Sequence, residues 1–525
     1  MGQTTLDNKR IEKTTPQKLG SIIKSVRDIM RKDKGLSGDL DRIPMITWIM
    51  FLKFLDDQEL IREAEAKLNN IEFQPTIESP YRWRDWAAKT DGITGSELLA
   101  FINQDEAVRP DGTRGMGLFA YLQSLSGTTE KDRRDVVSSV FKGVVNRMVN
   151  GYLLRDVMNK INEIHFSSTK EIHILGFLYE SMLKEMRDSA GDAGEFYTPR
   201  PVIQFMVKVI NPQLGETVMD PAAGTGGFLV ESYKHLRIQC KKSEDFEMLQ
   251  NSALTGFEAK PLPFLLCQMN MILHGIEIPD IDSGNALRFP LREIGDKERV
   301  DIVMTNPPFG GEEEPGIQGN FPKNKQTSET ALLFLQLIMR KLRRPIGGRK
   351  GGCCSMVVPN GTLFATGVGA RIKEDLLKNF SLDTIVRLPK GVFAPYTDIE
   401  TNLLFFNRNG STKEIWYYEH PLPLERQKLK NPCYTKSKSL RYEEFEPIIK
   451  WWNNREENEH VWKVTVEEVI KNNYNLDIRN PNKPKVEEHK DPLEIMNIID
   501  ETEKRIFEIM QEMKVLLTKG FDIAE

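Results

Sequence analysis

Apolar positions recur at helical spacing through the first part of the chain and then change to an alternation of strand-like and helix-like runs. Between residues 19 and 151 the helical pattern is punctuated by prolines, which predicts a bundle of helices. Further on, we expect strands over residues 217–219, 254–258, 275–281, 300–305, 353–359, 382–388 and 401–406, with helical runs between most of them. Strands that alternate with helices build sheets with helices on both faces. The sequence therefore predicts an α/β fold with a doubly wound, mostly parallel sheet of seven strands.

The pattern changes again after Arg408, where aromatic pairs and charged loops replace the alternation. Residues 492–517 form a strongly charged run whose apolar positions fall near coiled-coil spacing. We expect a helical C-terminal tail that docks either on its own chain or on a helix of a partner, and a partner is favoured.

A glycine-rich stretch, residues 220–228, follows the first strand of the predicted sheet and precedes an amphipathic helix. Glycines at a strand-to-helix turn let backbone N–H groups and a helix N-terminus approach a ligand. Alone this signal is weak, because a tight connection has the same appearance, and its spacing differs from the dinucleotide fingerprint G-x-G-x-x-G.

The more specific motif is Asn306-Pro307-Pro308-Phe309, at the end of another predicted strand. The prolines stop the strand ladder and fix the backbone. The side-chain oxygen of Asn306 and the carbonyl of Pro307 can then converge on one NH₂ group, and Phe309 offers a face on which a flat base stacks. This arrangement predicts methylation of an exocyclic amine through positioning and electrostatics. The alternative is a proline-rich turn with a core phenylalanine.

Other residues are placed where a pocket around these two stretches needs them. Thr198 is a candidate N-cap of a helix that closes one side of the pocket. Glu258 ends the second strand, where an acidic side chain can bind the ribose hydroxyls of a nucleoside cofactor. Asn285, beyond the third strand, can meet the cofactor's adenine ring. The connection 310–328 is long and polar, and we expect it to close over the target as a lid.

Charge and composition restrict the function. The net charge of −4 over 525 residues is unlike that of a protein that grips duplex DNA by itself. Five cysteines without metal-ligand spacing predict no metal site. The sequence contains no apolar run of membrane-spanning length and no signal-like N-terminus, so we expect a cytoplasmic protein without a membrane partner.

Two clusters have both a nucleic-acid and a structural interpretation. Basic residues gather at 340–344 and at 349–350, where they either touch phosphates or cap the end of a helix. In the segment Arg82-Trp83-Arg84-Asp85-Trp86, basic and aromatic residues interleave, but tryptophans at this spacing more often pack one face of a helix.

Taken together, these motifs resemble the modification subunit of type I restriction-modification systems. The resemblance covers most of the chain and includes residues 195–200, 220–228, 306–309 and 388–397, in the order of the gamma-type DNA adenine-N6 methyltransferases. It implies the Rossmann-like methyltransferase sheet, S-adenosylmethionine as cofactor, and the N6 amine of a DNA adenine as acceptor. The motif carries Phe309 where relatives often have tyrosine.

Carried over to this chain, the resemblance implies a role for each motif residue. Asn306 and Pro307 hold the target amine within the catalytic motif that Pro308 and Phe309 complete, while Phe309 and Phe393 stack on the two faces of a flipped adenine. Asp220 supports the methionine end of the cofactor. The expected cofactor-binding residues are Glu195, Phe196, Tyr197, Thr198, Pro199, Arg200, Asp220, Gly224, Thr225, Gly226, Gly227, Glu258, Asn285 and Ala286.

The resemblance also implies domains and partners. The expected domains are a helical interaction domain at 1–160, the methyltransferase domain at 165–415, an extension at 416–485 and a partner helix at 490–520. A separate specificity subunit reads the DNA and binds two modification subunits. No P-loop motif is present in the sequence, so a third, restriction and translocase subunit supplies ATP-driven cleavage.

Three other functions stay open at this stage. The same motif also methylates other amines, such as a protein glutamine or a base in RNA. A catalytically inactive scaffold with the same fold is disfavoured because the motif at 306–309 is intact, and a nicotinamide dehydrogenase fits least.

Overall fold

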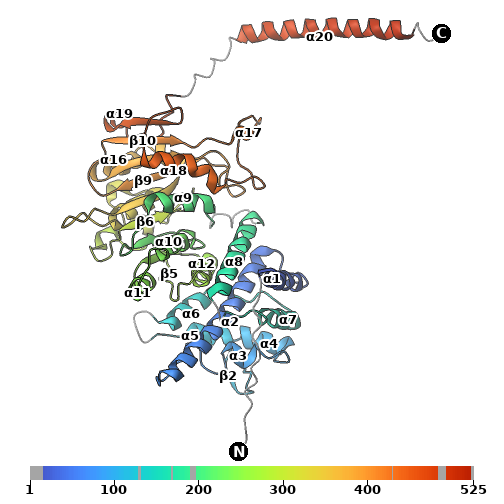
Figure 1. The fold of residues 1–525 in the computed structure, drawn as a ribbon, viewed down its shortest axis with the longest axis vertical. Helices are drawn as coiled ribbons and strands as arrows, with labels where there is room; N and C mark the ends of the chain where they lie inside the picture. The colour runs from blue at the N-terminus through green and yellow to red at the C-terminus, as the bar shows by residue number, and fades with distance from the viewer. Residues whose placement is uncertain are drawn as a thin grey trace, which may run out of the picture.

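The computed structural model describes residues 16–127, 132–166, 169–189, 197–428, 430–482 and 492–521. Figure 1 shows a helical part built by residues 16–189, an α/β part stacked on it, and a long C-terminal helix that projects from the α/β part. Among the described residues, no helix combines the length and the apolar character that crossing a lipid bilayer requires.

The helical part contains the predicted bundle together with one small hairpin that the sequence pattern did not reveal. The hairpin pairs β1 (Glu106–Val108) with β2 (Arg114–Met116). The helices are α1 (Pro16–Met30), α2 (Asp39–Leu68), α3 (Trp83–Trp86), α4 (Gly95–Asn103), α5 (Leu118–Ser124), α6 (Arg133–Phe141), α7 (Gly151–Ile161) and α8 (Thr169–Ser189).

The tryptophans of the segment 82–86 belong to the core of the helical part. Trp83 and Trp86 are both almost fully buried, and their ring centroids lie 5.8 Å apart. The arginines beside them pair with carboxylates: Arg82 with Asp85, and Arg84 with Asp56 and Glu63. The packing interpretation of this segment is therefore confirmed, and the nucleic-acid interpretation is wrong.

The α/β part is built on one sheet in the order β11-β10-β8-β9-β7-β6-β3-β4-β5. The strands are β3 (Val218–Asp220), β4 (Leu254–Phe257), β5 (Ile281–Asp282), β6 (Ile302–Thr305), β7 (Cys353–Pro359), β8 (Ser381–Arg387), β9 (Thr401–Asn407), β10 (Glu414–Glu419) and β11 (Val461–Thr465). All neighbours are parallel except that β9 is antiparallel to β7 and β8, and β11 is antiparallel to β10. The predicted α/β, doubly wound and mostly parallel sheet is confirmed.

The sheet has nine strands where seven were predicted. The two additional strands, β10 and β11, come from the extension after Arg408, and β10 pairs in parallel with β8 at the edge of the sheet. No helical run precedes the aromatic residues 416–418, so they fall outside the alternation of strands and helices. The sequence pattern therefore did not predict that they continue the sheet. Instead of ending at β8, the sheet continues into the extension.

The predicted strand 275–281 is mostly wrong, because only Ile281 and Asp282 pair with β4. Gly275 adopts a φ of 101°, and the backbone N–H of Ile276 bonds back to the carbonyl of Met271. The apolar residues of this segment therefore end a helix instead of forming a strand.

Helices cover both faces of the sheet, and alternate residues of each strand feed two separate cores. In β6, Ile302 and Met304 join one core while Val303 joins the other. The helices of this part are α9 (Arg200–Ile210), α10 (Gly227–Arg237), α11 (Ser243–Asn251), α12 (Pro261–Leu273), α13 (Pro315–Gln318), α14 (Thr330–Lys341), α15 (Asn360–Phe364), α16 (Val368–Asn379), α17 (Leu424–Gln427), α18 (Glu446–Asn453) and α19 (Val466–Lys471).

Helix α12 joins the two parts of the molecule. Every residue from Pro263 to Leu273 is buried, although the run winds through three turns of helix. A helix that is buried on all sides, as this mostly apolar one is, needs partners on all sides. Here α10 lies on one side, and α2, α6 and α8 of the helical part lie on the other.

The C-terminal helix α20 (Pro492–Phe521) stands apart from both parts in Figure 1. All of its side chains that the structure describes are exposed. Its exposed apolar side chains are Met496, Ile499, Ile506, Phe507, Ile509, Met510 and Met513.

Candidate active site

A cavity of about 200 Å³ opens at the carboxyl ends of the central strands. It lies where the strand order reverses, between β4 and β6 on either side of β3, which is where open α/β sheets bind ligands. Its lining residues are Thr198, Arg200, Ile203, Asp220, Pro221, Ala222, Ala223, Gly224, Thr225, Gly227, Phe228, Phe257, Glu258, Ala259, Lys260, Gly284, Asn285, Ala286, Asn306, Pro308, Glu313 and Phe334.

The glycine-rich turn forms the floor of this cavity. Gly224 and Gly226 have φ values of 55° and 77°, in the left-handed region that favours glycine, and α10 begins at Gly227. A Cβ atom at Gly227 would overlap Nη1 of Arg200. The turn therefore needs glycine both for its backbone conformation and for the close approach of a guanidinium group.

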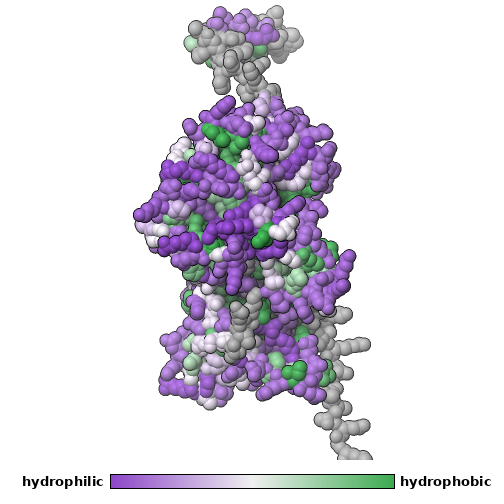
Figure 2. Space-filling view, turned by 90° about the vertical axis from the view of Figure 1, so that its left-hand side faces the viewer, coloured by the Kyte–Doolittle hydropathy of each residue, from purple (hydrophilic) through white to green (hydrophobic). Residues whose placement is uncertain are grey.

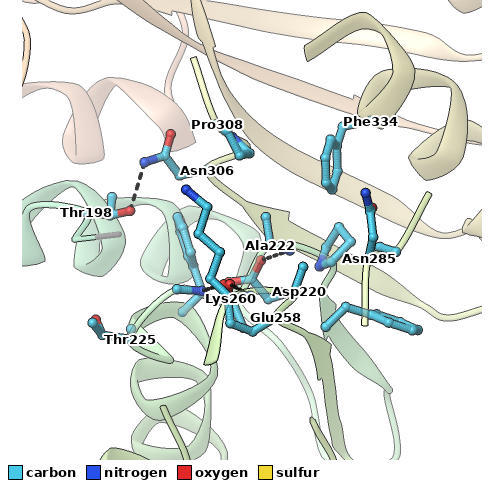
Figure 3. A pocket seen from close by; sticks show the side chains of 18 of the residues that line it. Thr198, Asp220, Ala222, Thr225, Glu258, Lys260, Asn285, Asn306, Pro308 and Phe334 are labelled. Atoms are coloured by element: carbon cyan, nitrogen blue, oxygen red, sulfur yellow. Dashed lines mark hydrogen bonds between the residues drawn. The ribbon is translucent and has the colours of Figure 1, made fainter. Parts of the chain in front are cut away.

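Asn306 lies at the rim of the cavity, and one of the two polar atoms of its amide makes no hydrogen bond with the described residues. Its Nδ2 donates to the hydroxyl of Thr198 at 3.0 Å, and Figure 3 shows this bond along one side of the pocket. Its Oδ1 is buried and has no hydrogen-bond partner among the described residues. Thr198 was predicted to cap α9, but Pro199 occupies that position, and the hydroxyl of Thr198 orients Asn306 instead.

A hydrogen-bonded network behind the cavity connects the glycine turn to α8. The guanidinium of Arg200 bonds to the carboxylate of Glu180 at 2.5 and 2.8 Å. The amide of Asn270 donates at 2.8 Å both to that carboxylate and to the backbone carbonyl of Thr225. Burial alone would raise the pKa of the Glu180 carboxyl, but Arg200 and Asn270 hold it below its usual value.

Arg200 keeps one donor for a ligand. Its Nη1 is buried without a hydrogen-bond partner among the described residues, and it lies against Gly227 on the cavity wall. A buried unpaired N–H is costly, so an anion such as a carboxylate is the expected complement. The side chain also lies 4.7 Å above the ring of Tyr197, which fixes its plane.

Asp220 is buried at the end of β3. Burial raises the pKa of its carboxyl to about 7, and the negative charge of Glu258 acts in the same direction, while the backbone N–H of Ala222 at 3.1 Å opposes the shift. The carboxyl thus gains its charge close to neutral pH, at the edge of the cavity.

This raised pKa predicts how stability depends on pH. In the unfolded chain the carboxyl loses its proton near its ordinary pKa of 3.8, whereas the folded chain keeps the proton until about pH 7. The free energy of unfolding therefore falls as the pH rises between these values. We expect Asp220→Asn to melt at a higher temperature than the unsubstituted protein at pH 8 and to show a flatter pH profile. Parallel melting profiles of the two proteins from pH 5 to pH 8 would contradict this pKa.

Glu258 and Asn285 line the cavity but are already oriented by the protein. The carboxylate of Glu258 accepts from the backbone N–H groups of Gly224 and Lys260 at 2.9 and 2.8 Å. The Oδ1 of Asn285 accepts from the N–H of Leu287, so its amide group turns its NH₂ into the cavity. In Figure 3, Asn285 and Phe334 lie at the end of the pocket opposite Thr198 and Thr225.

The two predicted stacking rings touch each other. Phe309 is half-buried, Phe393 is buried, and their centroids lie 5.6 Å apart in an edge-to-face arrangement. A base therefore has no space between them in this structure, and stacking on both faces requires the rings to separate.

The remaining predicted residues lie around the cavity without lining it. Tyr197 packs beneath Arg200, Pro199 begins α9, Gly226 precedes α10, and Pro307 is buried behind Asn306. Glu195 and Phe196 fall outside the described residues.

Several cavity residues were missed by the sequence analysis. Phe257 and Lys260 flank Glu258, so their nearness in sequence could have suggested them, and Figure 3 shows the Lys260 side chain running along the pocket. Glu313, Phe334 and Glu180 belong to segments that the fold alone brings to the site. No pattern in the sequence marks them.

The basic cluster lies at the far edge of the sheet from this cavity. Arg343 and Arg349 pair with Asp301 at the start of β6, whereas Asn306 follows the end of the same strand. Two further arginines, Arg299 and Arg408, lie outside this cluster and donate to the backbone carbonyl of Leu342, directly after α14. Figure 2 shows a mostly hydrophilic surface on the face it presents.

Within the described ranges, no group of His, Cys, Asp and Glu is arranged to hold a metal ion.

Comparison with known proteins agrees with this geometry. A family model described as N-6 DNA Methylase matches residues 170–490, and the HsdM N-terminal domain matches residues 19–161. The chain is 45% identical to the type I restriction enzyme EcoEI methylase subunit of Escherichia coli, over 95% of this chain and 97% of that one.

Solved structures give the same result. A modification subunit of a type I restriction enzyme from Vibrio vulnificus YJ016 superposes with a TM-score of 0.80 and 63% identity, over 91% of this chain and 99% of that chain. A chain from a study of complex assembly in a type I restriction-modification system superposes with a TM-score of 0.78 and 42% identity, over 97% and 99% of the two chains. The protein therefore belongs to the N-6 DNA methylase family and is a type I restriction-modification methylase subunit.

Proposed function

We propose that this subunit transfers a methyl group from S-adenosylmethionine to the N6 amine of an adenine flipped out of duplex DNA. The observation that carries the proposal is the unpaired Oδ1 of Asn306 at the cavity rim. A buried acceptor without a donor is costly, and an amine N–H is the donor that the motif suits.

The cavity residues fit the proposed cofactor from end to end. The unpaired Nη1 of Arg200 suits the carboxylate of the cofactor's methionine part. The turn through Gly224 and Gly226 leaves room for the rest of that methionine chain. Glu258, in the middle of the pocket, suits the ribose hydroxyls, and the slot beside Asn285 suits the adenine ring. When bound, the cofactor supplies an electrophilic methyl group on a sulfonium.

The protein's contribution to the reaction is orientation. Thr198 holds the amide of Asn306 so that Oδ1 accepts from the target amine, and the adjoining prolines fix the backbone that carries it. This grip aims the nitrogen lone pair away from the ring plane and toward the methyl group, which is preorganisation and not proton abstraction. The methylated nitrogen bears a positive charge and releases its proton to solvent.

Phe309 and Phe393 would receive the flipped base. We propose that Phe309 turns from its edge-to-face contact with Phe393 so that the base stacks between them. Stacking on aromatic rings repays part of the energy of extruding a base from the duplex.

The partner assignment rests on α20 and on charge. The described apolar side chains of α20 are all in water, which leaves this helix incomplete by itself, and a specificity subunit can cover them. The net charge of −4 also suits a subunit that relies on another polypeptide for most of its grip on DNA. We propose an assembly of two methylase subunits with one specificity subunit, to which a restriction and translocase subunit adds.

The test is transfer of labelled methyl from S-adenosylmethionine to duplex DNA from a strain that lacks the system. We expect transfer by the chain together with its specificity subunit, and much less by the chain alone. A chain that ends before α20 is the matched control and should fail to join the complex while keeping its melting temperature. Label in RNA or protein instead of DNA would overturn the proposed acceptor, and a complex that binds the cofactor without transfer would be an inactive scaffold.

A further inference from the structure

The connection after Phe309 does not form the expected lid over the target but lies folded against the flank of the cofactor cavity. It contains the short helix α13, and the side chain of Phe321 is buried in the core. Asn320 is tied to the neighbouring segment by hydrogen bonds to the carbonyl of Leu287 and from the N–H of Leu291. One residue of this connection, Glu313, lines the cavity.

Glu313 is held firmly at that place. Its backbone N–H donates to the carbonyl of Ser328 at 2.9 Å, and its carbonyl accepts from the side chain of Gln318 at 2.7 Å. Its carboxylate accepts from Nδ2 of Asn285 at 3.2 Å and from the hydroxyl of Thr330 at 3.5 Å. The carboxylate is therefore a fixed acceptor in the wall and not a mobile surface charge.

The surroundings of this carboxylate define what it can recognise. Phe257, Pro308 and Phe334 line the same cavity with apolar surface suited to a flat ring. The Oδ1 of Asn285 already accepts from the N–H of Leu287, and its NH₂ donates to Glu313, so both ends of this amide are engaged by the protein. The charged acceptor at this end of the cavity, among the lining residues, is the carboxylate of Glu313.

A carboxylate at the edge of a flat apolar slot selects rings that present an N–H donor. Adenine presents its exocyclic amine, whereas hypoxanthine carries a carbonyl oxygen at the same position and its N–H at the adjacent ring nitrogen, so a carboxylate fixed opposite that position meets a repelling oxygen. We propose that Glu313 accepts a hydrogen bond from the exocyclic amine of the cofactor's adenine and so makes the site selective for an adenosyl cofactor. The proposal rests on the cofactor named under the proposed function.

The placement of Glu313 connects the two substrates. Glu313 and Asn306 lie on one continuous segment, with Asn306 at the target amine and Glu313 at the far end of the cofactor. Binding of the cofactor's adenine ring to Glu313 therefore steadies the segment 306–313, which also carries the target-binding amide of Asn306.

The experiment compares the binding of S-adenosylhomocysteine and S-inosylhomocysteine to the full chain by titration calorimetry. We expect the unsubstituted chain to prefer the adenosyl compound by about ten- to a hundredfold, the range for a hydrogen bond to a charged group. Glu313→Ala should bring the two affinities within about threefold of each other. Glu313→Gln, whose amide can also donate, should bind the inosyl compound more tightly than the unsubstituted chain does. Glu314→Ala, at the exposed neighbouring position, should keep the full preference.

The outcomes separate this inference from the proposed function. Equal binding of both compounds by the unsubstituted chain, or a preference that survives in Glu313→Ala, would overturn the role of Glu313 while leaving the cofactor assignment intact. Failure of the unsubstituted chain to bind either compound would overturn both.

Discussion

Asn306→Ala is expected to lower the rate of methyl transfer by about a hundred- to a thousandfold, the range seen when one preorganised hydrogen-bonding group is removed from an active site. The loss should fall on the chemical step, because Oδ1 of Asn306 has no structural partner whose removal would unfold the site. Cofactor affinity should change little, since the glycine turn and Arg200 lie on other segments. Single-turnover transfer and calorimetric cofactor binding measure the two quantities separately.

Two variants sharpen this prediction. Asn306→Asp keeps the size and the acceptor oxygen but replaces the NH₂ that donates to Thr198 with a second oxygen, so it tests whether orientation matters as well as the acceptor. Thr198→Val removes the hydroxyl and should lower the rate by about tenfold, the cost of one hydrogen bond. An Asn306→Ala enzyme that transfers methyl groups at the normal rate would refute the site.

Glu180→Ala is expected to destabilise the protein by about 3 kcal/mol, because it leaves the guanidinium of Arg200 without its counter-charge. The two side chains are only 15% and 20% exposed, so water cannot replace the lost partner well. The amide of Asn270 also loses an acceptor, and with it the hold on the carbonyl of Thr225. We therefore expect a lower urea midpoint together with weaker cofactor binding.

The control for this prediction is an ion pair in water. Lys160 and Glu163 are 43% and 45% exposed, and Glu163→Ala should cost less than about 0.5 kcal/mol. Glu180→Gln, which keeps a hydrogen-bonding shape without the charge, should lie between the two. If Glu180→Ala and Glu163→Ala have the same urea midpoint, the network behind the cavity contributes nothing to stability.

The sequence predicted the parts of the fold that local chemistry determines. β7 matches the expected segment from Cys353 to Pro359, and α12, α14 and α16 lie between the strands, where helical runs were expected. These segments have either a continuous apolar run or a clear helical period. The strand prediction for 275–281 failed because its glycine and apolar residues form the C-terminal end of α12. Only the backbone hydrogen bond from Ile276 to Met271 reveals this role.

The site residues that directly follow a strand in the sequence were predictable. Asn306, the glycine turn and Glu258 each follow a strand, and strand ends meet at one edge of a parallel sheet. Glu313 and Glu180 carry no such mark, because Glu313 reaches the cavity through folding of a loop and Glu180 reaches the network behind it through packing of a distant helix. The direction of an amide, as in Asn285, depends on a neighbouring N–H that the sequence cannot place.

The complete burial of α12 from Pro263 to Leu273 has a consequence for anyone who wishes to study the catalytic part in isolation. Excising the N-terminal helices would strip the contacts with α2, α6 and α8 and leave a wall of leucine, methionine and phenylalanine in water. Such a fragment would aggregate instead of behaving as a minimal enzyme. The N-terminal helices are thus one half of the shell that keeps the catalytic sheet dry.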